Sequence, residues 1–305
     1  TSTNSSIGLI YALKKILIFM GIGNHELYFL KYISKNASFK SVATIGRQFL
    51  VSNPKDIKKI FQTNKLYEGY CENFFKQELN SLEIESFDFD SYEKADHIFD
   101  FNLELKNSKV YDLVIDFGSM EHIFNVTQAI KNISNLCKDG GYILHANPCS
   151  NLSGHGFYQF SPEFYYSVYS EENGFENTEV FLAEYPEDNK HIDYWYKTTK
   201  PKDGKRIEFY SDCAVGALVI TKKKQSKSNI KVIQSDYVEA YKNTRKFVEI
   251  KKTNKIKEFL KKINFVKKNL ANFGKIKYKF NKYRLFKSKY LKNNKNFEKF
   301  FFTKV

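Results

Sequence analysis

The sequence predicts an α/β fold whose central sheet is mainly parallel. Between Ser41 and Ile220, short β-branched segments alternate with amphipathic stretches, which is the order expected of strands joined by helices. The 305 residues include 42% hydrophobic and 17% aromatic residues, a composition that excludes a disordered chain and supplies a substantial core. The length corresponds to about two average domains.

Three strands are expected in the first half of this region. The first is Ser41–Ile45, and a helix begins after it at Asn53-Pro54, because Asn caps helix N-termini and Pro is tolerated in the first turn. The next two strands are Leu82–Phe87 and His97–Phe99, and aspartates follow both of them.

The second half is predicted to hold four more strands and two helices. Val110–Phe117 is the clearest buried strand, because it is an almost continuous apolar run. Glycines, prolines and a serine cap mark the ends of the elements that follow. These are a helix over about Glu121–Leu136, the strand Tyr142–Ala146, a helix from Ser161-Pro162, and the strands Thr178–Glu184 and Ala214–Ile220.

Charge is divided unevenly along the chain. Residues 223–305 contain 26 Lys and Arg and 5 Asp and Glu, a net charge of 26 − 5 = +21, whereas residues 1–222 contain 23 basic and 29 acidic residues, a net charge of −6. We therefore predict three parts: an N-terminal helical segment (1–40), an α/β domain (41–222) and a Lys-rich, mostly helical tail (223–305). Only the tail favours an anionic partner.

The tail contains a basic amphipathic stretch, Lys255–Leu270, in which apolar residues recur every three or four positions between lysines. Two interpretations are open: the apolar stripe docks on the body or a second subunit, or the helix lies on an anionic membrane. The aromatic residues among the lysines of 275–305 suit lipid headgroups and single-stranded nucleic acid alike. We prefer the membrane surface, because no nucleic-acid-binding fold accompanies the charge.

Two further features bear on where the protein works. The apolar stretch Ile7–Gly23 is interrupted by Lys14 and Lys15 and is followed by no small-residue cleavage site, so we expect an amphipathic helix that packs on the body or lies in a membrane interface. The four cysteines lie far apart and form no C-x-x-C pair, which argues against a zinc site or a disulfide framework and favours a reducing cytoplasm.

Carboxylates follow two of the expected strands. Ligands of open α/β sheets bind beyond the carboxyl ends of the strands, where the strand order reverses. Asp88 and Asp90 follow the second strand, where a carboxylate accepts hydrogen bonds from ribose hydroxyls, and Asp100 follows the third, where a carboxylate can accept from an adenine amino group. Together they predict adenosine recognition, and the open alternative is that they are surface-loop carboxylates.

The segment Tyr111–Phe175 contains Asp116-Phe117-Gly118 at a strand end, Glu121-His122 at the next helix start, and the Lys138-Asp139-Gly140-Gly141 turn with a strand after it. With these features it resembles the second half of a class I S-adenosylmethionine-dependent methyltransferase domain. The resemblance extends over about Ser41–Tyr185 and implies a Rossmann-like, seven-stranded, mainly parallel sheet with flanking helices that binds S-adenosylmethionine. The segment Gly154–Pro162, GHGFYQFSP, is also similar to a bacterial subgroup of methyltransferase-like proteins, many of which serve surface-polysaccharide pathways.

The resemblance also implies a set of cofactor-binding residues. The family's glycine-rich loop, G-x-G-x-G, corresponds here to Gly46-Arg47-Gln48-Phe49-Leu50, which keeps one glycine. Gly46 makes the turn, and Arg47 either pairs with the cofactor's carboxylate or lies on the surface. Asp116 either caps the following helix or borders the methyl-transfer centre. The full set is Gly46, Arg47, Asp88, Asp90, Asp100, Asp116 and Gly118.

Two histidines are candidates for catalysis. His155 is the better general base, because the glycines on either side leave its imidazole able to reach a substrate hydroxyl. The alternative is a loop that needs those glycines only to turn. His122 is the second candidate, and Tyr158 and Gln159 are expected to line the acceptor pocket. No metal is expected, since the six histidines show no H-x-x-x-H spacing.

We therefore expect a cytoplasmic S-adenosylmethionine-dependent methyltransferase that methylates a hydroxyl of a sugar or glycan precursor. We expect its tail to hold the protein at the inner membrane surface. Two alternatives are open: a methyltransferase fold without catalysis that serves as a scaffold in glycan assembly, and a nucleic-acid methyltransferase with a basic arm. The sequence contains no P-loop, G-x-S-x-G motif or paired cysteines, which argues against kinase, hydrolase and redox functions.

Overall fold

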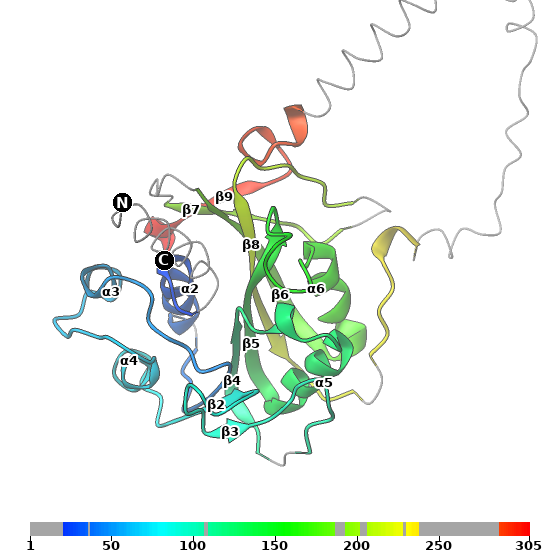
Figure 1. Cartoon of the computed structure of the whole chain (residues 1–305). Coiled ribbons are helices and arrows are strands. Elements are labelled where there is room, and N and C mark those ends of the chain that lie inside the picture. Colours follow the sequence, from blue (N-terminus) through cyan, green and yellow to red (C-terminus); the bar gives the residue numbers. More distant parts are fainter. Residues whose placement is uncertain are drawn as a thin grey trace, which may run out of the picture.

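The computed structural model describes residues 21–35, 37–106, 109–186, 193–201, 206–227, 230–237 and 287–305. The strands of these residues form one sheet in the order β3-β2-β1-β4-β5-β8-β6-β7-β9, with helices on both faces (Figure 1). The strands are β1 Ser41–Ile45, β2 Glu83–Asp88, β3 His97–Ile98, β4 Tyr111–Phe117, β5 Cys137–Ser150, β6 Phe175–Tyr185, β7 Tyr194–Lys197, β8 Ala214–Lys223 and β9 Glu298–Phe301.

The first five strands give the sheet its parallel part. β1 pairs in parallel with β2 and β4, β2 with β3, and β4 with β5. β8 then lies antiparallel between β5 and β6. The order 3-2-1-4-5 is that of a doubly wound Rossmann sheet, so the predicted Rossmann-like α/β fold is confirmed. The described sheet has nine strands instead of seven, because β7 and β9 form in segments whose sequences suggest an insertion and a tail.

Capping side chains explain where the helices begin. Asn53 Oδ1 accepts a hydrogen bond from the Lys55 N–H at 2.9 Å, and Ser161 Oγ accepts one from the Phe164 N–H at 3.3 Å. The helix expected from Glu121 is divided into a 3-10 turn, η1, and a later α-helix that Asn125 caps. The helical elements before the tail are α2 Asn24–Ser34, α3 Pro54–Phe61, α4 Glu72–Glu78, η1 Met120–His122, α5 Val126–Leu136, α6 Pro162–Val168 and η2 Glu171–Asn173.

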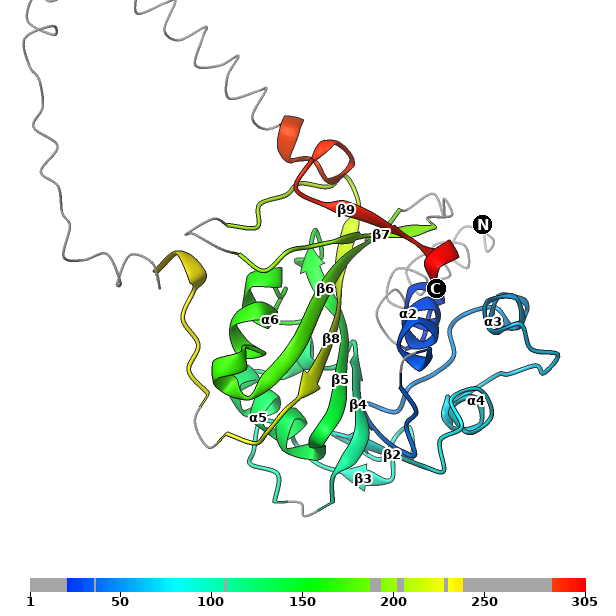
Figure 2. The same cartoon turned by 180° about the vertical axis from the view of Figure 1, so that it is seen from behind.

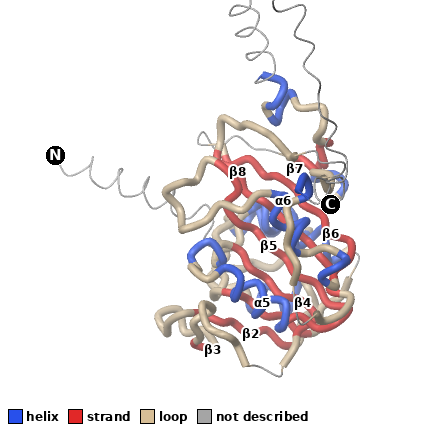
Figure 3. Tube along the Cα trace, turned by 90° about the vertical axis from the view of Figure 1, so that its right-hand side faces the viewer, coloured by secondary structure: helices blue, strands red, loops and turns tan. Residues whose placement is uncertain are grey.

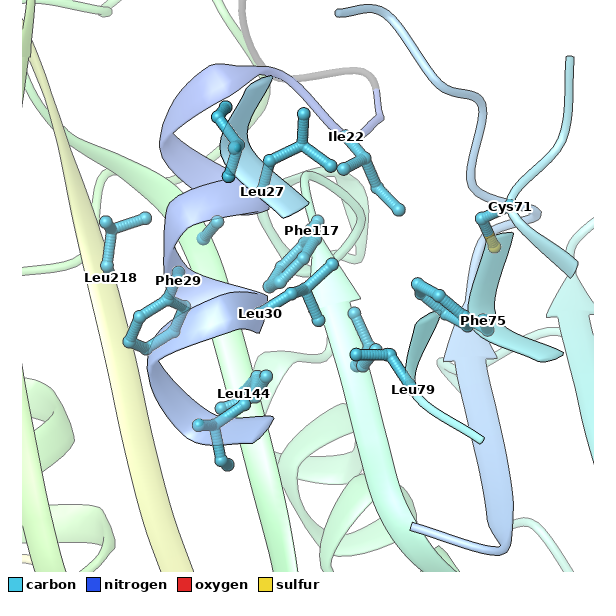
Figure 4. Close-up of a cluster of buried hydrophobic side chains, with 14 of the residues drawn as sticks. Ile22, Leu27, Phe29, Leu30, Cys71, Phe75, Leu79, Phe117, Leu144 and Leu218 are labelled. Atoms are coloured by element: carbon cyan, nitrogen blue, oxygen red, sulfur yellow. The ribbon is translucent and has the colours of Figure 1, made fainter. Parts of the chain in front are cut away.

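The helices form two layers, with α2, α3 and α4 on one face of the sheet and α5 and α6 on the other (Figures 1 and 2). Figure 3 views the sheet from the side of α5 and α6. On the opposite face, Leu27, Phe29 and Leu30 of α2 lie buried against Phe117 and Leu144 of the sheet (Figure 4). Burial of each such side chain stabilises the fold by about 1.5–3 kcal/mol.

The end of the chain belongs to this core. β9 pairs antiparallel with β7 (Figure 2), and Phe302 and Val305 are buried in the same cluster as Trp195. Residues 287–305 therefore differ from the expected, mostly helical tail: between the short 3-10 turns η3 (Leu291–Asn293) and η4 (Phe302–Lys304) they add a strand to the sheet.

Two predicted helices cannot be compared with the structure. Residues 7–20 and the basic stretch Lys255–Leu270 lie outside the described residues. In the part of the chain that is described, no helix is both long and apolar enough to span a membrane.

Candidate functional site

The strand order reverses between β1 and β4, whose carboxyl ends lead into Gly46 and Gly118. Ligands of doubly wound sheets bind at this reversal. Both glycines have left-handed φ angles, +75° at Gly46 and +85° at Gly118, so each permits a sharp turn out of its strand. The two turns are the starting point of the site.

Gly46 is also held close to the loop after β4. Its N–H donates to the Phe87 carbonyl at 2.7 Å, while Ser119 Oγ donates to the Ile45 carbonyl at 2.7 Å. A Cβ added at Gly46 would lie 2.6 Å from Ser119 Oγ, which is closer than atoms can approach. The position therefore requires glycine for its conformation and for its space.

The loop after Gly46 is tied to the segment before α4. Arg47 Nε donates to Glu72 Oε1 at 2.7 Å, its Nη1 donates to the Glu93 carbonyl at 2.7 Å, and its guanidinium lies 4.0 Å from the ring centroid of Tyr70. The Arg47 side chain thus joins α4 to the loop after β2. Its contact with the cofactor's carboxylate stays a prediction.

Gln48, which the sequence did not single out, lies buried over the end of β1. Its Nε2 donates to the Ile45 carbonyl at 3.1 Å, whereas its Oε1 is buried and accepts no hydrogen bond from any described residue. Buried acceptors are normally paired, so an unpaired one beside a ligand-binding turn points to a donor that a ligand brings.

The three predicted aspartates lie at the carboxyl edge. Asp88 accepts hydrogen bonds from the Arg47 N–H at 3.3 Å and the Phe89 N–H at 2.7 Å. Asp90 is exposed and accepts from the Tyr92 N–H at 2.8 Å. Asp100 Oδ1 accepts from the backbone N–H of Asn102 at 2.9 Å and from its side-chain amide at 2.7 Å. All three shape the loops in which they lie, and Asp88 and Asp100 remain partly exposed.

Large apolar side chains are exposed in the loops at this edge. Each belongs to the segment that follows β2, β3, β4 or β5, and their exposed fractions range from 61% to 89%. Exposed apolar groups of this size are typical of surfaces that a ligand or partner covers. They are Phe89, Tyr92, Leu103, Phe124 and Phe157.

Asp116 is wholly buried and holds other residues of the site by hydrogen bonds. Its Oδ1 accepts hydrogen bonds from the N–H groups of Ser119 and Met120 at 3.1 and 3.0 Å, so it caps η1, as one of the two interpretations of this residue expected. Its Oδ2 contacts His145 Nδ1 at 2.7 Å and accepts from Asn147 Nδ2 at 3.0 Å. The other interpretation, that Asp116 borders the methyl-transfer centre, stays a prediction, although its carboxylate has no exposed surface in the structure.

A buried hydrogen-bond network connects Asp116 to Glu121. His145 Nε2 contacts the Tyr169 hydroxyl at 2.6 Å, and the Tyr165 hydroxyl donates to Asn147 Oδ1 at 2.7 Å. Burial raises the pKa of both tyrosines well above the usual value, so both stay protonated donors. Asn147 Nδ2 also donates to Glu121 Oε2 at 3.1 Å. The network thereby fixes one oxygen of Glu121.

The other oxygen of Glu121 faces the two candidate histidines. Glu121 Oε1 is buried, accepts no hydrogen bond from the described residues, and lies 3.4 Å from His155 Nε2 and 4.0 Å from His122 Nε2. The imidazole rings of His122 and His155 are 5.1 Å apart. The side chain of His122 is 48% exposed and that of His155 is 16% exposed. The carboxylate itself is wholly buried.

The glycine after His155 determines this arrangement. Gly156 has a φ of +75°, and a Cβ there would lie 2.8 Å from the Glu121 carbonyl oxygen and 2.9 Å from its Cγ. The Phe157 N–H donates to that carbonyl at 2.8 Å. The loop after β5 therefore packs directly on η1, and the Gly-His-Gly sequence brings His155 to Glu121.

Tyr158 and Gln159 hold this loop in place. The Tyr158 hydroxyl donates to the Phe124 carbonyl at 2.8 Å, and Gln159 Oε1 accepts from the Leu152 N–H at 2.8 Å. Their predicted role in lining an acceptor pocket stays a prediction.

The expectation that no metal is bound stays a prediction, but the structure brings together three residues that could hold one. Glu121, His122 and His155 present three ligand atoms within 4.8 Å of one another. Spacing along the sequence could not reveal this set, because one imidazole comes from the loop after β5 and packs across the chain onto η1. The signals that were present are the adjacent Glu121-His122 pair and the glycines around His155.

Residues 65–202, less than half of the chain, match a family model described as a methyltransferase domain. The matched region runs from the segment before α4 to beyond β7 and includes Glu121, His122 and His155. This match supports the methyltransferase resemblance. The narrower subgroup with the GHGFYQFSP segment, and its link to surface polysaccharides, stay predictions. No curated protein matches the sequence.

Three solved structures are similar to the chain at low identity. One is the 1,6-didemethyltoxoflavin-N1-methyltransferase of Burkholderia thailandensis with bound S-adenosylhomocysteine, at 11% identity and a TM-score of 0.40 over 72% of this chain and 87% of that one. TehB of Haemophilus influenzae aligns at 13% identity and a TM-score of 0.38 over 64% of this chain and 62% of that one. The O-methyltransferase from the trans-AT PKS multienzyme of Brevibacillus brevis, also in complex with S-adenosylhomocysteine, aligns at 12% identity and a TM-score of 0.34 over 59% of each chain. Nothing about the substrate of this chain follows from scores this low.

Proposed function

We propose that this protein transfers a methyl group from S-adenosylmethionine to a hydroxyl group of a sugar or glycan precursor. The observation that carries the proposal is the position of Glu121, His122 and His155, which lie in the loops that follow β4 and β5, beside the reversal of the strand order. The methyltransferase-domain match over residues 65–202 supports the same reaction.

The residues at the turn after β1 fit the amino-acid end of the cofactor. Gly46 carries no side chain toward Ser119, and the buried Gln48 Oε1 is an acceptor that an ammonium group would satisfy. Asp88 would bind the ribose hydroxyls, and Asp100 the adenine amino group. The cofactor supplies a methyl group bonded to a positively charged sulfur. Arg47, held by Glu72, has no part in this assignment.

The histidines are positioned to act on the acceptor. A hydroxyl must lose its proton as it attacks a methyl group, and imidazoles are the usual groups that assist this loss near neutral pH. We assign His155 and His122 as the catalytic residues, because both lie at Glu121 and retain exposed surface. Phe124 and Phe157, whose ring centroids are 5.9 Å apart, offer apolar faces to a sugar ring.

Calorimetric titration of the full chain with S-adenosylmethionine tests the proposal. We expect one cofactor per chain, and binding about tenfold weaker or more for Asp88→Asn, because a hydrogen bond to a charged group is lost. Glu104→Gln is the matched control, because Glu104 lies with Lys138 and Asp139 at the opposite end of the sheet. This variant should bind S-adenosylmethionine as tightly as the wild type does. A folded chain that binds no cofactor would leave the non-catalytic scaffold as the better account.

We also propose that the protein works in the cytoplasm at an anionic membrane surface. The net charge of +21 on residues 223–305 supports this location, since lysines near an anionic bilayer are attracted to it. Nucleic acid is the competing partner, and the two are separated by comparing vesicle binding with RNA binding.

A further inference from the structure

We infer that Glu121, His122 and His155 form a binding site for a divalent first-row transition metal ion. The three side chains present their ligand atoms within 4.8 Å of one another, at the carboxyl ends of the neighbouring strands β4 and β5. Binding of the ion does not depend on the proposed methyl transfer, whereas the role of the ion in catalysis rests on that function.

One of the separations in the cluster is that which such an ion requires. Bonds of about 2.0–2.2 Å from the ion to nitrogen and oxygen place two ligand atoms of a tetrahedral site roughly 3.4 Å apart. Glu121 Oε1 and His155 Nε2 are 3.4 Å apart. His122 Nε2 lies 4.0 Å from the same oxygen and belongs to a half-exposed side chain, so it would have to move closer to complete the site.

The unpaired oxygen of Glu121 points to a ligand. The residue is wholly buried, and its Oε1 accepts no hydrogen bond from the described part of the chain. A buried carboxylate oxygen that accepts no hydrogen bond costs free energy, and a bound cation would compensate it. A cation bound to this oxygen would be near both imidazoles, whose Nε2 atoms lie 3.4 and 4.0 Å from the oxygen.

Groups behind the cluster are arranged as they are behind metal ligands. Carboxylates that bind metals are themselves hydrogen-bonded, which fixes their orientation. Asn147 holds Glu121 Oε2 at 3.1 Å, and Tyr165 holds Asn147 at 2.7 Å. The contact of Gly156 with the Glu121 backbone fixes the loop that carries His155.

The ligand set selects the class of metal. Two imidazole nitrogens and one carboxylate oxygen suit Zn²⁺, Co²⁺, Fe²⁺ and Ni²⁺, whereas Mg²⁺ and Ca²⁺ prefer oxygen ligands throughout. Three protein ligands leave coordination positions open, as in catalytic zinc sites. An acceptor hydroxyl in an open position would lose its proton to solvent water, and its oxygen would keep the electron pair, stabilised by the ion. With the ion bound, His155 and His122 would serve as its ligands, and the ion would take over the assistance to proton loss that the proposed function assigns to the two imidazoles.

Titration of the chelator-stripped full chain with Co²⁺ and with Zn²⁺ tests the site. We expect one ion per chain and a visible Co²⁺ absorption band typical of nitrogen and oxygen ligands. His155→Ala and His122→Ala should each weaken binding about tenfold or more. His97→Ala is the control, because that histidine is also partly exposed and pairs with a glutamate, Glu85, away from the cluster. The His97→Ala variant should bind Co²⁺ and Zn²⁺ as tightly as the wild type does.

His122→Ala keeps the test decisive if the other variant is unstable, since this side chain is 48% exposed and its removal should leave the thermal unfolding midpoint unchanged. Absence of stoichiometric Co²⁺ binding, or full binding by both variants, would overturn the site. Equal affinity for Mg²⁺ would overturn the class of metal. A chain that binds Co²⁺ but not S-adenosylmethionine would keep the metal site and refute the proposed methyl transfer.

Discussion

Among single residues, Gly46 is under two constraints that mutation can separate. Its φ is +75°, and a Cβ would lie 2.6 Å from Ser119 Oγ. We expect Gly46→Ala to lower the free energy of unfolding by about 2–4 kcal/mol, the sum of left-handed backbone strain and the displacement of a packed neighbour. Urea denaturation measures this loss, and calorimetry should show weaker cofactor binding as well.

Gly69 provides the matched control for this change. Its φ is +81°, and nothing lies within 4 Å of the position that a Cβ would take. Gly69→Ala should therefore cost only the backbone strain, about 1–2 kcal/mol. In a Ser119→Ala background, which removes the clashing hydroxyl, the effect of Gly46→Ala should fall toward the same value. Equal losses for the two glycine variants in the wild-type background would show that contact with Ser119 does not matter.

Glu26 makes stability depend on pH. Burial raises the pKa of this carboxyl from 4.5 to about 7, although hydrogen bonds from the Tyr185 hydroxyl and the Gly23 N–H, both 2.9 Å, act in the opposite direction. The folded chain therefore binds this proton more tightly than the unfolded chain does. The stabilisation is complete below about pH 4.5 and is lost as the pH rises through about 7.

Glu26→Gln should remove this dependence. Between about pH 5 and about pH 8, the wild type should lose on the order of 3 kcal/mol more unfolding free energy than the variant. The reason is that the wild type loses the stabilisation from the protonated carboxyl, whereas the variant has no carboxyl at this position. Chemical denaturation of both proteins across this range measures the difference. Parallel curves would mean that Glu26 ionises normally in the folded chain.

Among the elements, strands that carry their own pattern could be predicted, whereas strands that depend on a distant partner could not. Val110–Phe117 is apolar enough to mark β4 without further information. β7, Tyr194–Lys197, is short and mixed in character, and it extends the sheet toward β9, which comes from the far end of the chain. A basic composition there gave no sign that Phe302 is buried.

The same distinction applies to the site. Asp88 and Asp100 could be placed because each directly follows a predicted strand. The role of Arg47 could not, because its partners Glu72 and Tyr70 come from the segment inserted before β2. The proximity of His155 to Glu121 depends on backbone packing at Gly156, which no spacing rule describes.

The buried end of the chain can be tested with two adjacent phenylalanines. Phe302 is 8% exposed, and its ring stacks on Tyr28 with centroids 4.1 Å apart, whereas Phe301 is 40% exposed. We expect Phe302→Ala to lower the unfolding free energy by about 3–5 kcal/mol, and Phe301→Ala by clearly less. Urea denaturation compares the two. Equal, small effects of the two substitutions would show that Phe302 does not contribute to the core.

In the whole molecule, most of the excess positive charge and the packed C-terminus belong to different segments of the chain. Residues 238–286 contain 16 basic and 3 acidic residues, a net charge of 16 − 3 = +13, while residues 287–305 pack on the sheet. Truncation after Lys222 would remove β9 and Phe302 together with the lysines, so a loss of membrane binding in that variant would have two causes. Substitutions in the intact chain avoid this ambiguity.

Four lysines of the basic stretch, Lys261, Lys262, Lys267 and Lys268, are suited to such a test. Each lysine near an anionic surface contributes about 1 kcal/mol, so changing all four to Gln should weaken binding to anionic vesicles by more than about tenfold. The control carries the same change of charge on the body, at the exposed Lys55, Lys58, Lys59 and Lys65.

Vesicle sedimentation at low and high salt measures both variants, and salt should weaken binding of the wild type. If the control loses as much as the tail variant, net charge alone draws the protein to the membrane; if RNA binding falls while vesicle binding does not, the partner of the tail is nucleic acid.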